Sequence, residues 1–160
     1  MKTAQQWFDE YGESHRHPIN KLLHWVCVPS IFFSIVGLFA SIPHAFLDSW
    51  FPVSWAPYVN FATLALLLTM IFYFIISRTI FVGMVLVAAL SLWGIAVVVQ
   101  AAFMPLWLFS VLVFVVAWIG QFIGHGIEGA KPSFFKDLQF LLVGPAWLLH
   151  FVYRKLGIPL

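Results

Sequence analysis

The sequence predicts an all-α fold, a multi-pass bundle of membrane helices whose polar residues gather at one membrane face. Of its 160 residues, 62% are hydrophobic and only 9% are charged, and the mean hydropathy is +0.98. This is more apolar surface than one small globular core can bury, so lipid must cover the excess. Since no low-complexity linker divides the chain, we expect residues 1–160 to form a single integral membrane domain.

Four apolar windows are long enough to cross a bilayer, whose hydrocarbon core of about 30 Å needs about 20 helical residues. None of the four contains an acidic residue, and they are residues 22–42, 58–77, 79–99 and 106–124. A fifth and shorter apolar run, at 138–153, has Gly144-Pro145 in its middle. Proline there removes a helical hydrogen bond and favours a kink.

The distribution of Lys and Arg predicts the topology, because these residues favour the cytoplasmic side of short loops. The loops at 43–57 and 100–105 contain neither residue, whereas the N-terminal arm, Arg78 and the segment up to Lys136 do. Four spans therefore place every basic cluster as far as Lys136 on the cytoplasmic side and both loops without Lys or Arg on the other side.

A fifth span would leave Arg154 and Lys155 outside. We therefore predict that 138–153 forms a kinked re-entrant or interfacial helix and that both termini are cytoplasmic. A fifth span remains the alternative, because the charge rule is a bias. The expected location is the bacterial inner membrane, or the endoplasmic reticulum in a eukaryote.

Composition also limits the function. The basic and acidic residues are scattered among hydrophobic runs, so the chain lacks the basic patch that nucleic-acid binding requires. Cys27 is the only cysteine, so any metal must be bound through nitrogen and oxygen. The first 21 residues lack the apolar segment and cleavage site of a signal peptide, and we expect them to be retained.

The predicted topology sorts the histidines. His15, His17 and His24 precede or open the first helix, and His125 closes the fourth, so these four share the cytoplasmic interface. His44 lies in the opposite loop, separated by about the thickness of the membrane, and we interpret it as a solvated loop residue.

Two short patterns bring polar side chains together. Asn20 and His24 are four residues apart and share a helical face, and Pro18 suits the first turn of that helix. Because Pro18 lets the chain turn before the helix begins, His15 can fold back toward His24.

The second pattern is a polar stripe near the end of the fourth helix, formed by Gln121, His125 and Glu128. Polar groups at membrane depth face the bundle interior, a cavity or one another. Either close helix packing or a ligand explains the glycines around the stripe, which are Gly120, Gly124, Gly126 and Gly129.

Three imidazoles from two segments beside one carboxylate suit a divalent transition metal such as iron or zinc. A cluster of structural, hydrogen-bonded histidines is the alternative. Ligand type does not identify the metal, since neutral imidazole binds iron, zinc, copper and nickel alike.

These residues resemble a known family, the membrane-bound, iron-dependent 2-hydroxy fatty acid dioxygenases of fatty-acid α-oxidation, over nearly the whole chain. The first signature is Tyr11, His15, Asn20, His24 and Pro29 at their spacing. The second is Gln121-Phe122-x-Gly124-His125-x-x-Glu128-Gly129-x-x-Pro132, and a weaker third is Gly144-Pro145. The resemblance implies that His15, His24 and His125 are catalytic ligands of Fe²⁺, whereas His17, His44 and His150 fit no place in the pattern.

The resemblance also implies that a 2-hydroxy fatty acid is cleaved with dioxygen to a fatty acid one carbon shorter, in eukaryotes as a step of phytosphingosine breakdown. Such an acid chelates a metal through its carboxylate and hydroxyl oxygens, and three imidazoles leave positions for it. We expect its chain to lie among apolar side chains of the bundle, reached from the lipid. Arg16, Lys21 and Lys131 either meet the carboxylate or anchor the chain at the interface, and we assign them no catalytic role.

Asn20, Gln121 and Glu128 are expected to orient the histidines, because a metal-bound imidazole usually donates its other N–H to a carboxylate or carbonyl. Three points stay open: whether Glu128 is itself a ligand, whether His150 is one, and whether one metal or two are bound.

The alternative function is a non-catalytic lipid-binding or scaffold membrane protein, with the histidines in a closed structural zinc site or a polar cluster. A proton-coupled transporter is a weaker alternative, because no ionisable residue lies near the middle of a predicted span.

Overall fold

The computed structural model describes residues 2–48, 50–52, 55, 58–129 and 140–160, and every regular element within these ranges is a helix. In chain order the helices are α1 (Ala4–Gly12), α2 (Pro18–Ala40), α3 (Ala45–Asp48), α4 (Phe61–Ile76), α5 (Arg78–Ala101), α6 (Leu106–Glu128) and α8 (Val143–Leu156). The predicted all-α class is therefore correct for the described residues.

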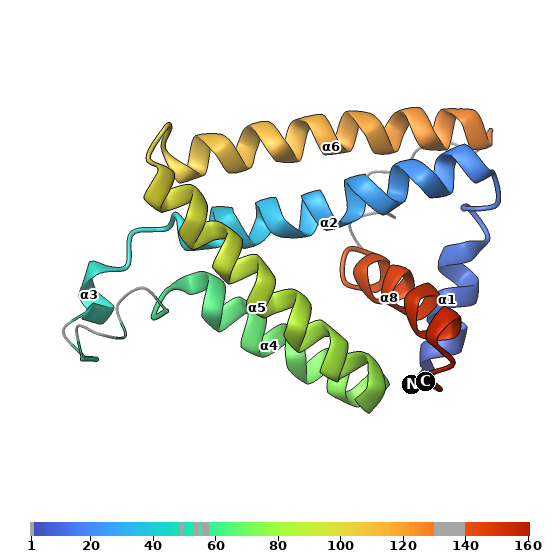
Figure 1. Cartoon of the computed structure of the whole chain (residues 1–160), viewed down its shortest axis with the longest axis horizontal. Coiled ribbons are helices and arrows are strands. Elements are labelled where there is room, and N and C mark those ends of the chain that lie inside the picture. The colour runs from blue at the N-terminus through green and yellow to red at the C-terminus, as the bar shows by residue number, and fades with distance from the viewer. Residues whose placement is uncertain (1, 49, 53–54, 56–57, 130–139) are drawn as a thin grey trace.

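The longest helix contact joins α2 and α6, which run antiparallel side by side (Figure 1). A hairpin of α4 and α5 leans against α2 at an angle. α1 and α8 pack together beside the start of α2 and the end of α6, and both chain ends lie at this end of the molecule (Figure 1). One end of the bundle is therefore built from α1, the start of α2, the end of α6 and α8.

Three helices are long and apolar enough to cross a membrane, namely α2, α5 and α6, with 23, 24 and 23 residues. α4 is apolar but has only 16 residues, a length of about 24 Å at 1.5 Å per residue. This is shorter than the hydrocarbon core of a bilayer. Three candidate spans thus correspond to three of the four predicted windows, and four full spans are not confirmed.

The C-terminal helix differs from its prediction. Residues 130–139 lie outside the described residues, and α8 begins at Val143, so Gly144-Pro145 opens the helix instead of interrupting it. Proline is tolerated in a first turn, where the missing N–H has no intrahelical partner. α8 packs against α1, α2 and α5.

Local signals explain where the helices at the charged end start and stop. Thr3 caps α1 in a capping box with Gln6, each side chain bonding the backbone N–H of the other. His17 caps α2 through its side chain, with Pro18 in the first turn as predicted. α6 is capped by Gly129, whose φ of +74° is a left-handed conformation that glycine adopts without strain.

Two of the four glycines near the polar stripe let α2 and α6 approach closely. A Cβ added at Gly124 would lie 2.3 Å from Oδ1 of Asn20, and one at Gly120 would lie 2.6 Å from Sγ of Cys27. A Cβ at Gly126, by contrast, would meet nothing within 4 Å. Helix packing therefore accounts for Gly120 and Gly124.

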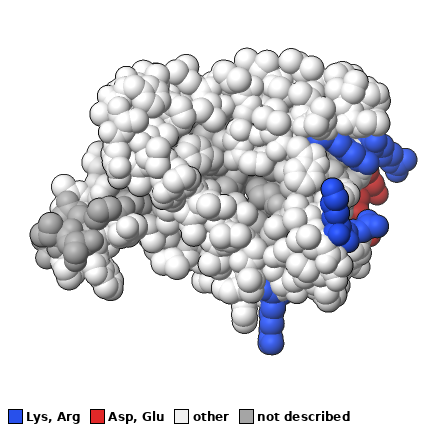
Figure 2. All heavy atoms as spheres, in the orientation of Figure 1, with Lys and Arg blue, Asp and Glu red and all other residues white. Residues whose placement is uncertain are grey.

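Charge is distributed unevenly over the surface. In the view of Figure 2, most Lys and Arg side chains lie toward the end of the molecule that carries α1 and α8, another basic side chain projects at the lower edge, and the rest of the described surface in this view is uncharged. Large apolar side chains are exposed along the apolar helices, among them Leu67 of α4, Leu86 of α5 and Val116 of α6. This surface is compatible with a membrane protein.

Candidate metal centre

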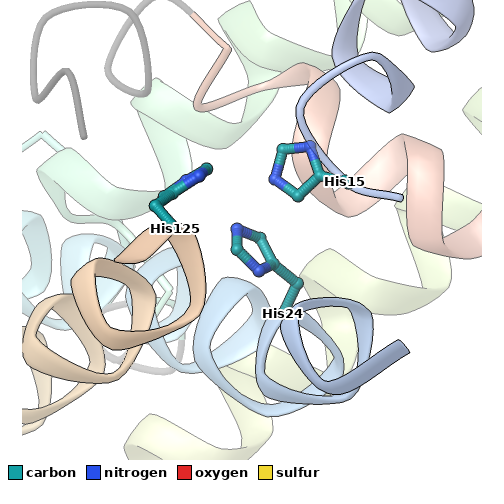
Figure 3. A group of neighbouring side chains, drawn as sticks. All are labelled: His15, His24 and His125. Atoms are coloured by element: carbon teal, nitrogen blue, oxygen red, sulfur yellow. The ribbon is translucent and has the colours of Figure 1, made fainter. Parts of the chain in front are cut away.

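The structure brings His15, His24 and His125 together at the charged end of the bundle (Figure 3). They come from three separate places: the turn between α1 and α2, the second turn of α2, and the last turn of α6. The ring centroids are 4.2 Å apart for His15 and His24, 5.2 Å for His15 and His125, and 5.1 Å for His24 and His125. All three side chains are buried, with at most 3% of their surface exposed.

His15 is held by the helix that precedes it. Its Nδ1 lies 2.6 Å from the backbone carbonyl oxygen of Tyr11, and the Tyr11 ring stacks on the imidazole at 4.2 Å. Trp147 of α8 packs against both rings, at 5.4 Å from His15 and 5.1 Å from Tyr11. Two aromatic side chains thus fix the plane of the imidazole and shield it from water.

The Nδ1 contacts define the tautomers of two histidines. Nδ1 of His24 lies 2.9 Å from the carbonyl oxygen of Asn20, as Nδ1 of His15 does from Tyr11. A carbonyl oxygen only accepts, so each Nδ1 must carry the proton, and each neutral ring then has its lone pair on Nε2. This is the usual arrangement of a metal-binding histidine, with the second nitrogen oriented by a carbonyl.

The side chains of Asn20, Gln121 and Glu128 are expected to orient the histidines, and for Nδ1 of His15 and His24 the contacts are with backbone instead. Backbone carbonyls orient His15 and His24. Gln121 is buried one helical turn before His125 and lines a small cavity of about 20 Å³ with Tyr11 and other apolar side chains.

Glu128 instead holds the N-terminal arm in place. Its carboxylate accepts the backbone N–H groups of Arg16 and His17, both at 2.8 Å, and the side-chain amide of Asn20 at 3.1 Å. The same amide of Asn20 donates to the carbonyl of Ser14 at 3.1 Å. Glu128 and Asn20 therefore fix the turn that carries His15 against α6.

The three histidines fit a single metal ion. Their possible ligand atoms all lie within 4.8 Å of one another. Nitrogens bound at about 2 Å to one tetrahedral ion stand about 3.3 Å apart, so the rings need to close by up to about 1.5 Å. Three neutral, buried imidazoles form a donor set for a divalent transition metal, and they do not identify which metal it is.

The remaining histidines lie outside this group. His17 caps α2 and accepts the N–H of Ile19 at 3.2 Å. His44 lies beyond the far end of α2, where its ring contacts the carbonyl of Ile42. His150 stacks on Phe8 of α1 at 5.1 Å. Lys131, a candidate for the substrate carboxylate, lies outside the described residues.

Sequence reasoning missed the contribution of α1 and α8 to this centre. The pair Thr3 and Gln6 is a capping-box signal that predicts α1. For Trp147 no local pattern marks the contact with His15, because the two residues meet only through the packing of α8 on α1.

Comparison with known proteins identifies a family. A family model described as "Mpo1-like: 2-hydroxy-palmitic acid dioxygenase Mpo1-like" matches residues 1–156. No curated protein and no solved structure matches the chain.

Proposed function

Because that match covers almost the whole sequence, the chain belongs to the Mpo1-like family, and from this premise we propose that it is an Fe²⁺-dependent dioxygenase. Its substrate is a 2-hydroxy fatty acid, which it shortens by one carbon. The carbon–carbon bond between the carboxyl and hydroxyl carbons breaks, and one dioxygen balances the conversion to the shorter acid, carbon dioxide and water.

The observation that carries the proposal is the buried group of His15, His24 and His125. A structural zinc site is normally closed by four protein ligands, whereas a catalytic site keeps positions open. Among the described residues no fourth His, Cys, Asp or Glu joins the three. This supports a catalytic centre over the closed structural site of a scaffold protein.

Iron, when bound, supplies the activation of dioxygen and the attachment point for the two oxygens of a 2-hydroxy acid. The protein's own residues hold and protect that centre. Nε2 of His15 and His24 offers the lone pair because the carbonyls of Tyr11 and Asn20 fix the proton on Nδ1. Tyr11 and Trp147 cover His15 and keep water from one side of the group.

The test is substrate discrimination by purified protein in detergent with ferrous iron and air. 2-Hydroxyhexadecanoic acid should give pentadecanoic acid, detected by mass spectrometry. Hexadecanoic acid lacks the hydroxyl arm of the chelate, and the 3-hydroxy acid forms a larger ring, so both should react poorly. A site built around a polar contact rejects analogues that lack it strongly. Equal turnover of hexadecanoic acid, or no pentadecanoic acid from iron-loaded protein, would defeat the assigned reaction.

We further propose that the metal centre lies at the cytoplasmic face of the membrane, with both chain ends on that side. The gathering of Lys and Arg at the end with α1 and α8 (Figure 2) supports this orientation. The loop between α5 and α6, at the other end of the bundle, contains no Lys or Arg.

A further inference from the structure

A polar pocket of about 450 Å³ lies beside the histidine group, between α1, the start of α2, and α8. His15 forms part of its wall. Three cationic side chains line the pocket. Arg16 comes from the turn before α2, Lys21 from the first turns of α2, and Arg154 from the end of α8. The pocket thus connects the water-facing surface with one of the three candidate ligands.

The charge of this pocket favours an anion on the wall formed by α2 and α8. Within the described residues the ion pair is between Lys2 and Glu10. Arg16, Lys21 and Arg154 therefore form no ion pair with a described acidic residue. The two acids of the pocket, Asp9 and Glu13, belong to α1 and the residue that caps it. An incoming carboxylate is therefore repelled from α1 and attracted to α2 and α8.

His150 also lines the pocket and adds no charge to it at neutral pH. Burial and the nearby Arg154 lower the pKa of this imidazole, against a smaller opposing effect of Asp9. The attraction for an anion therefore comes from the three cations.

An apolar groove of about 360 Å³ lies between α2, α5 and α8. Figure 2 shows this face of the molecule hollowed between these helices. Trp25, Pro29 and Phe33 of α2 form one side, and Leu148 and Val152 of α8 face Leu90 of α5 across it.

The pocket and the groove follow the same two helix faces. Lys21 in the pocket is four residues from Trp25 in the groove, and Trp25 is four residues from Pro29, so the three share one face of α2. On α8, Phe151 in the pocket and Leu148 in the groove are three residues apart. The combined surface is charged at the end of the bundle and apolar further along it.

The length of this surface suits a fatty acid. From Lys21 to Phe33 the helix rises about 18 Å, and the acyl chains of one leaflet fill about 15 Å, half of the hydrocarbon core. A 2-hydroxy acid that gives its hydroxyl and one carboxylate oxygen to a metal keeps the other carboxylate oxygen for the cations.

We propose that the polar pocket and the apolar groove are one binding site for a fatty acid, with Arg16, Lys21 and Arg154 selecting the carboxylate and the groove of α2, α5 and α8 holding the chain. This inference rests on the proposed function for the identity of the acid. It assigns the three cations to substrate specificity and makes α8 a wall of the substrate site.

Another apolar groove provides the internal control. It has a volume of about 540 Å³, lies between α2 and α6, and includes Val113 and Val116. It reaches Phe103 and Met104, at the opposite end of α6 from His125, and no charged residue lines it. It therefore offers a fatty acid a place for the chain without a partner for the carboxylate.

The experiment measures binding without turnover. The iron-loaded, full-length protein in detergent is kept free of oxygen, and equilibrium binding of 2-hydroxyhexadecanoic acid is compared with that of its methyl ester. Lys21→Gln and Arg154→Gln should each weaken binding of the acid roughly 5- to 10-fold and leave binding of the uncharged ester unchanged. A general loss of structure would weaken both ligands alike.

Two tryptophan substitutions locate the chain. Val152→Trp fills the proposed groove and should weaken binding at least about 10-fold, because the indole displaces several methylenes of the acyl chain from their apolar contacts. Val116→Trp fills the other groove and should have no effect. Both residues are partly or largely exposed. Leu90→Trp, also exposed in the proposed groove, replaces Val152→Trp if that variant does not fold.

A derivative of the acid with a diazirine near the end of its chain should crosslink within 29–33 or 87–91. Crosslinks within 109–117, or loss of binding only in Val116→Trp, would overturn the inference. The two proposals fail separately. Binding as expected without product after admission of oxygen would defeat the reaction alone, whereas product formation with unaltered binding in Val152→Trp and Leu90→Trp would defeat the binding site alone.

Discussion

Glu128, the last residue of α6, accepts the backbone N–H of His17, the cap of α2, at 2.8 Å. The two residues are 111 positions apart in the sequence. The carboxylate also accepts the backbone N–H of Arg16 and the side-chain amide of Asn20. These contacts fix the turn that carries His15 against the helix that carries His125. Its role in the structure is to set the distance between two of the three candidate ligands.

Glu128→Gln should therefore weaken iron binding without removing a ligand. The substitution keeps the size of the side chain but replaces one acceptor oxygen with a donor group, which faces N–H donors on the arm. Changes to residues that orient metal ligands typically cost about 10- to 100-fold in metal affinity. Iron titration measures the effect, and faster hydrogen exchange of the amides of Arg16 and His17 should accompany it.

Glu10→Gln is the matched control, because Glu10 is a surface carboxylate of α1 that pairs with Lys2. Its iron affinity should equal that of the unchanged protein. Equal affinity in Glu128→Gln would show that the arm holds its position without this carboxylate.

Replacing His15, His24 or His125 by Ala should lower the iron content of the purified protein, with a larger effect than that of Glu128→Gln. Direct ligands contribute more than the residues that orient them. His44→Ala, at the other end of the bundle, should retain its iron. Undiminished iron in the triple variant would remove the metal centre from consideration, and iron content is measured by mass spectrometry of the metal.

Gly124→Ala should destabilise the protein, because the new methyl group would lie 2.3 Å from Oδ1 of Asn20. Overpacking of this kind typically costs about 1–3 kcal/mol. Gly126→Ala is the comparison two residues away, where the methyl group meets nothing within 4 Å. Alanine is the better helix former by up to about 1 kcal/mol, so this variant should be at least as stable. Thermal unfolding in detergent compares the two.

Topology reporters test the orientation of the bundle. Fusions near 131 and 160 should report the cytoplasmic side, and fusions near 50 and 103 the opposite side, because the loops there lack Lys and Arg. A periplasmic or lumenal signal at 131 would contradict the cytoplasmic placement of the metal centre. The fusion near 50 also tests whether α2, the first candidate span, crosses the bilayer.

The proximity of the three histidines was predictable because it depends on local rules. Pro18 starts α2 in its first turn, and the turn before it brings His15 back to His24. Helix length and the loop charges place the end of α6 beside the start of α2. That these histidines bind iron stays a prediction.

The tertiary contacts were not predictable in the same way. Glu128 is visible in the sequence, but its partners are not. They are two backbone N–H groups in a turn more than 100 residues earlier, and no local pattern links the two segments. The start of α8 at Val143 likewise depends on its packing against α1 and α2. The length of α4 shows the limit of hydropathy, since an apolar window of 20 residues there yields a helix of 16.

The distance in sequence between His15 and His125 has a consequence for how the protein is made. At the usual rates of about 5–20 residues per second, His125 is synthesised roughly 5 to 20 s after His15. During that interval the nascent chain carries two of the three ligands and lacks the carboxylate that anchors their turn. The proposed metal centre can therefore be completed only late in biogenesis, after the end of α6 has left the ribosome.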